Sequence, residues 1–392
     1  MFQLQVRKLS KSTYPQLNDK MLKPKIAVIG LKGLPAFGGA ATVGESLISR
    51  LQNDFNFTVY SVASHTNNKG QQKGYYQIVF RTFSLMKLNI FFYYLKSAFH
   101  ALFFENYDLI HLHHVDGAFI LPLLRLKYKV ILTSHARPQI AEKWPWYVKF
   151  FFRINERVAL ILSNEVSCVS EMLMNYYNLV SVRKIYYIPN GVELILPVKE
   201  HNIPFNDYIL FAAGRIIPLK GLHILIKSLK ITGYKGKLIV AGNIDQMPDY
   251  KKKIMNTVRD LDVEFIGLIK NKELLFSYLS HCKLFVFPSI NENMSVMLLE
   301  AAAMKVPLIC SDIPANTLIF NDDEVLFFEN NNPNDLAEKI RFYINDTDSQ
   351  KYRIQKAYDK LQTFYSWARI AAIYQQLYLK AMRLKNTGGT NS

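Results

Sequence analysis

The sequence predicts an α/β protein made of two doubly wound, mostly parallel sheets that follow one another along the chain. Short apolar segments alternate with longer helix-patterned segments over most of the 392 residues. The apolar segments are nearly continuous runs of Val, Ile, Leu and Phe, which is typical of parallel strands buried on both faces. The stretch LPVKEHNIPFND (196–207) replaces this pattern with Pro, Asn and charges, which indicates a domain boundary.

Each sheet is assigned from apolar segments in chain order. The strands expected in the first sheet are KIAVIGL (25–31), FTVYSVA (57–63), YDLIHLH (107–113), KVILTSH (129–135), EVSCVS (165–170) and KIYYIPN (184–190). Those expected in the second sheet are YILFAAG (208–214), KLIVAG (237–242), VEFIGL (263–268), KLFVFPS (283–289) and PLICSD (307–312). We therefore expect domains at 23–196 and 203–365, with a basic, weakly ordered tail at 1–22 and a second tail at 385–392.

Composition points to an anionic partner and a reducing compartment. The net charge is +17, and residues 1–200 hold 24 Lys and Arg against 12 Asp and Glu. Such an excess favours phospholipid, nucleic acid or a polyanionic acceptor as the partner. Three cysteines without metal spacing indicate buried thiols. Residues 1–22 lack the apolar core of a secretory signal, and no apolar run is long enough to span a membrane.

The residues that follow the strands are the candidates for chemistry, because ligands of such sheets bind outside the carboxyl ends of the strands. The loop GLKGLPAFGG (30–39) could bring backbone N–H groups close to a ligand, although on its own a flexible turn is the better interpretation. In GRIIPLKG (214–221), Arg215 and Lys220 flank a short loop beside Gly214. Two cations there suit a diphosphate, and solvated surface charges are the equally weighted alternative.

Two glutamates stand eight positions apart in the segment SINENMSVMLLEAAAMKVPLICSD (289–312). Glu292 is expected in the loop after a strand, and Ser295 is expected to cap a helix from Val296 to Met304. The free N–H groups of that helix N-terminus would suit a phosphate. Glu300 lies among Leu and Ala residues, where an idle charge would be costly, so a surface role fits poorly.

Together these motifs resemble the retaining GT-B glycosyltransferases that use nucleotide-diphosphate sugars, of the family 4-like type with an E-x7-E motif. The loop at 30–39, SHARPQIAEKW (134–144) and IPNGVE (188–193) are similar to segments of a bacterial branch that builds surface polysaccharides. The resemblance covers roughly residues 24–380. It implies two Rossmann-like domains with a cleft between them, and a terminal helix, 366–384, that packs back on the first domain.

The resemblance also implies roles for individual residues. The catalytic residues would be Glu292, at the donor sugar, and His135, near the reacting sugar. The donor-binding residues would be Arg215 and Lys220 at the diphosphate and Glu300 at the ribose, joined by Gly38, Gly39, Gly214, Asn293, Met294, Ser295 and Val296. Catalysis would need no metal and no other cofactor, because Arg, Lys and the helix dipole would stabilise the departing diphosphate. Lys305 stands where the family commonly has Gly, so a left-handed bend there would be mildly strained.

The resemblance implies transfer of a sugar, from a UDP-sugar by preference, to a growing and lipid-linked bacterial surface glycan. The expected location is the cytoplasm, peripheral on the inner face of the cell membrane. The aromatic segments 85–104 and 144–162 are core helices in the simplest interpretation, and one of them against an anionic bilayer is the alternative.

The sequence leaves three other functions and one other site as alternatives. The other functions are a different GT-B enzyme of the phosphorylase or epimerase type, a basic nucleic-acid-binding protein and a non-catalytic assembly protein. No nucleic-acid-binding module is visible in the sequence. His111 and His113 share one face of a strand and could chelate a metal, but buried or capping histidines are favoured because ligand partners are missing at the right spacing.

Overall fold

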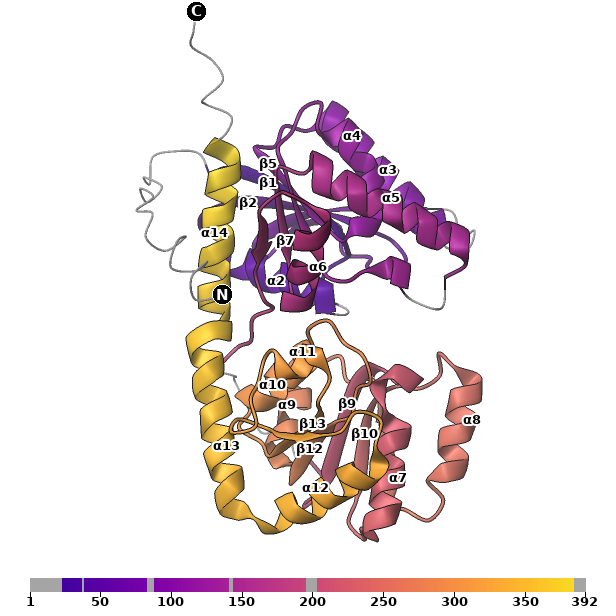
Figure 1. Cartoon of the computed structure of the whole chain (residues 1–392). Coiled ribbons are helices and arrows are strands. Elements are labelled where there is room, and N and C mark those ends of the chain that lie inside the picture. The colour runs from indigo at the N-terminus through magenta and orange to yellow at the C-terminus, as the bar shows by residue number, and fades with distance from the viewer. Residues whose placement is uncertain (1–22, 37–38, 83–87, 141–143, 195–202, 384–392) are drawn as a thin grey trace, which may run out of the picture. The chain divides into compact units, whose positions relative to one another are not determined.

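A computed structural model describes residues 23–36, 39–82, 88–140, 144–194 and 203–383. The two expected tails lie outside these ranges. The chain forms two compact units (Figure 1). Unit 1 comprises Met1–Asn190 and Trp367–Ser392, and unit 2 comprises Gly191–Ser366.

Unit 1 is built on an eight-stranded sheet in the order β3-β4-β2-β1-β5-β6-β7-β8. All neighbouring strands are parallel except β3 and β4. The strands are β1 (Lys25–Lys32), β2 (Asn56–Val62), β3 (Gly70–Gln72), β4 (Tyr75–Phe80), β5 (Leu109–His113), β6 (Val130–Ser134), β7 (Glu165–Cys168) and β8 (Ile185–Tyr187). The helices are α2 (Gly39–Leu51), α3 (Leu88–Phe104), η1 (Val115–Ile120), α4 (Leu121–Leu124), η2 (Pro138–Ile140), α5 (Trp146–Leu162), α6 (Glu171–Val180) and α14 (Trp367–Arg383).

The C-terminal helix α14 belongs to unit 1 although it follows unit 2 in sequence. Its apolar residues pack with α2 and with β1 and β2 in one core, which includes Ile370 and Leu377. Polar contacts add to this packing, because the Tyr378 hydroxyl lies 2.7 Å from His111 Nδ1 and Lys380 Nζ donates to Glu165 Oε1 at 2.5 Å. Figure 1 shows α14 on one side of the sheet and α3, α4 and α5 on the other.

Unit 2 contains a six-stranded parallel sheet in the order β11-β10-β9-β12-β13-β14. Its strands are β9 (Ile209–Arg215), β10 (Leu238–Asn243), β11 (Val263–Gly267), β12 (Leu284–Phe287), β13 (Leu308–Ser311) and β14 (Leu326–Phe328). Its helices are η3 (Pro218–Lys220), α7 (Leu222–Thr232), α8 (Pro248–Thr257), α9 (Lys272–His281), α10 (Val296–Ala303), α11 (Pro314–Thr317), α12 (Pro333–Asn345), α13 (Thr347–Lys360) and η4 (Leu361–Tyr365). The strand order reverses between β9 and β12, so their carboxyl ends mark the expected ligand position.

The predicted fold class, two doubly wound α/β sheets, is confirmed, and every expected strand is present within a few residues of its predicted bounds. Three strands, β3, β4 and β14, were not anticipated. All three cysteines are buried and free, as the sequence indicated. Of the helices in the described ranges, none combines the length and the apolar character needed to cross a bilayer.

Candidate active site

Two loops of unit 2 meet where β9 and β12 end. The loop after β9 turns through Gly221, which has a φ of 74°. A Cβ atom there would lie 1.8 Å from the carbonyl oxygen of Pro288, so only glycine lets the loop pack against the end of β12. Ile290 N also donates to the carbonyl oxygen of Leu219 at 2.9 Å. These contacts hold the loop with the predicted cations beside the loop with Glu292.

Lys220 and Glu292 form an ion pair across these two loops. Lys220 Nζ donates to Glu292 Oε1, and the two side chains are 26% and 13% exposed. The sequence placed both residues around one ligand, and the structure brings them into direct contact. The predicted diphosphate cation is therefore paired with the predicted sugar-binding carboxylate.

Arg215 is the other predicted diphosphate cation, and its environment differs. It is the last residue of β9 and is exposed, next to the exposed Gly214. In the ranges that the structure describes, its guanidinium group makes no hydrogen bond or ion pair. Arg215 is thus available to an anion at the carboxyl edge of the sheet.

Helix α10 begins between the two glutamates, as the sequence predicted. Ser295 caps the helix, and its hydroxyl accepts a hydrogen bond from Leu298 N at 3.4 Å. The backbone from Asn293 to Val296 forms the approach to this N-terminus, where the positive end of the helix dipole suits an anion. The helix ends one residue before the predicted Met304, and Lys305 adopts the predicted left-handed bend with a φ of 56°.

Glu300 lies inside α10 and is only 8% exposed. Its Oε1 accepts from Lys272 Nζ at 3.2 Å. Burial raises the pKa of Glu300, and the Lys272 ammonium group opposes that shift. Lys272 was missed in the sequence, although it follows β11 at the same edge of the sheet. Each of the two glutamates thus has its own lysine partner.

The predicted histidine of unit 1 follows β6 and belongs to a histidine cluster. His135 Nε2 lies 3.0 Å from His113 Nδ1, and its ring lies 4.8 Å from that of His114. Burial, together with the charge of His114, lowers the pKa of His135 well below its ordinary value. The ring of His135 is therefore neutral near pH 7.

His111 and His113 are both buried, as the sequence analysis favoured. His111 lies 2.7 Å from the hydroxyls of Tyr378 and Thr133, so it is held within the core by hydrogen bonds. Within the described ranges, no group of three or more His, Cys, Asp or Glu side chains is placed to hold a metal ion. Of the predicted glycines, Gly39 begins α2, whereas Gly38 lies outside the described residues.

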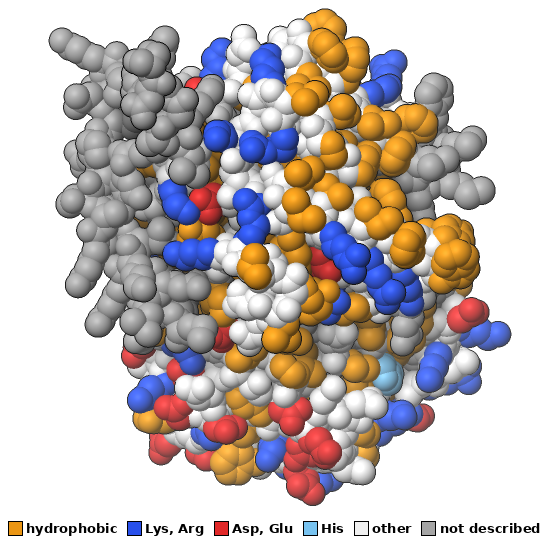
Figure 2. Space-filling model, turned by 45° about the horizontal axis from the view of Figure 1, so that its top comes forward, with side chains coloured by type: hydrophobic (Ala, Val, Ile, Leu, Met, Phe, Trp, Pro, Cys, Tyr) orange, Lys and Arg blue, Asp and Glu red, His pale blue; other side chains and the backbone are white. Residues whose placement is uncertain are grey.

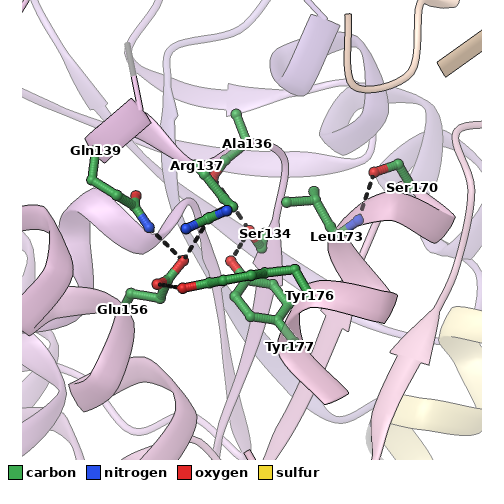
Figure 3. Close-up of polar contacts among 9 residues, drawn as sticks. All are labelled: Ser134, Ala136, Arg137, Gln139, Glu156, Ser170, Leu173, Tyr176 and Tyr177. Carbon is green, nitrogen blue, oxygen red and sulfur yellow. Dashed lines mark hydrogen bonds and ion pairs between the residues drawn. The ribbon is translucent and has the colours of Figure 1, made fainter. Parts of the chain in front are cut away.

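A buried polar network that the sequence analysis did not predict holds the loop after β6 (Figure 3). Its centre is Glu156 of α5, which is 4% exposed. Glu156 accepts from Gln139 Nε2 at 2.7 Å and from the Tyr176 hydroxyl at 2.9 Å. Arg137 lies 3.6 Å from the same carboxylate and 3.3 Å above the Tyr176 ring. The segment after His135 is therefore tied to α5 and α6 rather than loose.

Comparison with known proteins finds a glycosyltransferase family match in each half of the chain. Residues 37–195 match the description "Glycosyltransferase Family 4", and residues 198–360 match "Glycosyl transferases group 1". An uncharacterized glycosyltransferase of Methanocaldococcus jannaschii is 26% identical over 88% of this chain and 96% of its own length. An N-acetylgalactosamine-N,N'-diacetylbacillosaminyl-diphospho-undecaprenol 4-alpha-N-acetylgalactosaminyltransferase of Campylobacter jejuni is 24% identical over 52% of this chain and 56% of its own length.

Solved structures agree with the fold. The sucrose-phosphate synthase of Thermosynechococcus elongatus has a TM-score of 0.76 at 20% identity, covering 92% of this chain and 100% of that one. HepE of Anabaena, solved with UDP and glucose, has a TM-score of 0.70 at 17% identity, covering 91% of this chain and 99% of that one. The chain is therefore a glycosyltransferase with the GT-B fold, in which a family 4 segment precedes a group 1 segment.

Proposed function

We propose that the protein is a retaining glycosyltransferase that moves a sugar from a nucleotide-diphosphate sugar, a UDP-sugar by preference, to a growing, lipid-linked bacterial surface glycan. UDP is favoured because HepE, a protein of the same fold, was solved with UDP and glucose. The lipid-linked acceptor is supported by the Campylobacter relative, whose name contains diphospho-undecaprenol. The proposed place of work is the cytoplasmic face of the cell membrane.

The observation that carries this proposal is the arrangement at the carboxyl edge of the unit 2 sheet. Arg215 is unpaired in the described ranges, Lys220 is paired only with Glu292, and α10 begins between Glu292 and Glu300. We assign Arg215, Lys220 and the N-terminus of α10 to the diphosphate. Glu300 accepts hydrogen bonds from the ribose hydroxyls, and Glu292 accepts them from the donor sugar.

These residues supply what the reaction needs at its leaving group. The bond between the anomeric carbon and the diphosphate oxygen breaks. A new bond forms on the same face from that carbon to the oxygen of an acceptor hydroxyl, whose proton passes to the departing diphosphate. Negative charge grows on the departing diphosphate. In this proposal Arg215, Lys220 and the helix dipole stabilise that charge without a metal ion. His135 keeps the role that the resemblance implies, near the reacting sugar.

Calorimetry with free UDP tests the donor assignment. Wild type should bind UDP, and Arg215→Ala should bind it more weakly by a few kcal/mol at most, because one charge-assisted contact is lost. If both Arg215→Ala and Lys220→Ala bind UDP as tightly as wild type, the assignment of these residues to the diphosphate is wrong. A screen of nucleotide sugars with product analysis then separates transfer from epimerisation or phosphorolysis, since only transfer releases UDP and lengthens the acceptor.

A further inference from the structure

Two helices of unit 1 expose aromatic side chains along one stripe each. Eight Phe and Trp side chains are exposed in the described part of the chain, and seven of them lie on α3 and α5. On α3 they are Phe91, Phe92, Phe99, Phe103 and Phe104. On α5 the exposed stripe consists of Trp146, Tyr147, Phe150, Arg153, Ile154, Arg157 and Ile161, which recur at helical spacing. Both helices therefore turn apolar faces outward.

The two stripes form one surface. Phe119 of η1 stacks on Phe91 with ring centroids 4.7 Å apart, and its centroid lies 5.8 Å from that of Phe151 in α5. Leu123 and Leu126 are also exposed, at α4 and just after it. Beside them lies a hollow of about 540 Å³, lined largely by apolar residues of α3 and α4. Figure 2 shows hydrophobic side chains gathered over one side of this view, with Lys and Arg among them.

The charge of this surface is positive. Helices α3, α4 and α5 together contain four Lys and Arg against one Asp or Glu. Helix α3 has no acidic residue, and the single one in α5, Glu156, is buried on the inner side. Exposed Lys96, Arg153 and Arg157 lie within the aromatic stripes themselves. Aromatic side chains with interleaved cations match the interfacial layer of an anionic bilayer, where rings enter the acyl boundary and cations meet the headgroups.

We infer that the outer face of α3, α4 and α5, together with Phe119, embeds in one leaflet of an anionic membrane. Seven exposed Phe and Trp side chains on two neighbouring helices are unusual on a monomer in water. The interleaved cations favour anionic lipid as its partner over an uncharged apolar surface. The role rests on the proposed transfer to a lipid-linked acceptor, whose hydrocarbon lies in the same leaflet.

The inner side of α5 connects this face to the loops around His135. Asn155 Nδ2 donates to the carbonyl oxygen of Asp116 at 3.0 Å, in the segment that follows His114. Glu156 holds Gln139 and Arg137 of the loop after β6, as Figure 3 shows. The helix that lies on the lipid thus carries, on its other side, the loop that follows the candidate catalytic histidine. Leaflet binding would set the height of that loop above the membrane.

Vesicle flotation of the full chain tests the surface. Wild type should bind vesicles of phosphatidylcholine with phosphatidylglycerol, bind pure phosphatidylcholine more weakly, and be released as salt rises. The double substitution Trp146→Ser and Phe150→Ser should weaken binding by about tenfold or more, because two side chains lose their apolar burial. Arg153→Gln with Arg157→Gln should reduce the dependence on phosphatidylglycerol and on salt.

Phe342→Ser is the matched control, because Phe342 is 50% exposed on α12 of unit 2 and Phe150 is 57% exposed. It should bind vesicles like wild type. UDP affinity, measured on the same variants, should not change, so loss of the donor site and loss of the lipid surface are separate results. The inference is overturned if neither double substitution changes vesicle binding. It is also overturned by a dimer in sedimentation velocity that the Trp146 and Phe150 substitutions dissolve, since the surface would then belong to a second copy.

Discussion

The ion pair between Lys220 and Glu292 gives a prediction that separates nucleotide binding from turnover. Glu292 Oε1 accepts a hydrogen bond from Lys220 Nζ. A diphosphate that binds Lys220 must compete with this carboxylate. Glu292→Gln removes the competitor and keeps the shape of the side chain. We therefore expect UDP affinity in Glu292→Gln to stay the same or rise, whereas turnover falls.

The size of each effect follows from the exposure of the pair. Ion pairs near the surface contribute about 0–1 kcal/mol, so the gain in UDP affinity should be at most about fivefold. Lys220→Ala removes a charge-assisted contact to the diphosphate instead, which costs about 1.5–3 kcal/mol, or roughly 10- to 150-fold in Kd. Turnover in Glu292→Gln should fall far more than binding changes, because the contact to the sugar is strongest in the transition state.

Calorimetry with UDP and steady-state kinetics with the full donor measure these effects. Glu324→Gln is the matched control, since Glu324 pairs with Lys360 at 2.7 Å and the two side chains are similarly buried, at 11% and 19% exposed. It should lower thermal stability and leave UDP affinity unchanged. The reasoning is refuted if Glu292→Gln loses UDP affinity tenfold, or if it turns over like wild type.

Four further predictions concern charge and backbone. Burial raises the pKa of Glu300 above its ordinary value of 4.5, so folding takes up a proton there and the stability of the protein falls as pH rises through the folded pKa. The melting temperature of Glu300→Gln relative to wild type should therefore increase as pH rises through that range. The same substitution should cost about 1.5–3 kcal/mol of UDP affinity. Activity should survive excess EDTA, and a complete loss that Mg²⁺ restores would contradict the proposed leaving-group stabilisation. Turnover should show no step near pH 6.5 from His135, whose pKa lies well below that value, and a step that disappears in His135→Gln would refute this. Lys305→Gly should change stability by less than about 1 kcal/mol in thermal melts, because relief of the left-handed backbone is offset by loss of the contact of Lys305 Nζ with the Tyr358 ring at 3.9 Å.

Much of the fold could be predicted because its central strands are continuous apolar runs. The strand β4 (Tyr75–Phe80) was missed because a polar residue interrupts the run. Gln77 is fully buried, and its Oε1 accepts from Leu34 N at 3.0 Å and from Ser61 Oγ at 2.9 Å. A glutamine satisfied by distant partners looks like a surface residue in sequence. The strand β14 was missed because it is only three residues long at the edge of its sheet.

The candidate site likewise has features that could be predicted from local sequence and contacts that could not. The loop position of Glu292 and the cap at Ser295 follow from local sequence, because a strand, a loop and a helix N-terminus succeed one another within a few residues. The partner of Glu300 does not, because Lys272 lies 28 residues earlier and reaches it only through the fold. The network around Glu156 was equally hidden, since Gln139 and Tyr176 approach it from two different elements.

The two lysine partners give the spacing of the glutamates a physical reason. Glu300 is deeply buried, and its partner Lys272 lies outside the loops that we assign to the diphosphate. Under that assignment, Glu300 keeps its cation when a nucleotide binds. Glu292 is compensated by the same Lys220 that we assign to the diphosphate. When UDP alone takes Lys220, a carboxylate with 13% of its side chain exposed is left without its cation, at the cost of about 0–1 kcal/mol estimated for this pair. The hydroxyl groups of an intact donor sugar would supply hydrogen bonds to that carboxylate. Under the proposed assignment, UDP alone leaves the Glu292 carboxylate without a partner, whereas an intact nucleotide sugar supplies hydrogen bonds to it. Recognition of the nucleotide is thereby coupled to recognition of the sugar to be transferred.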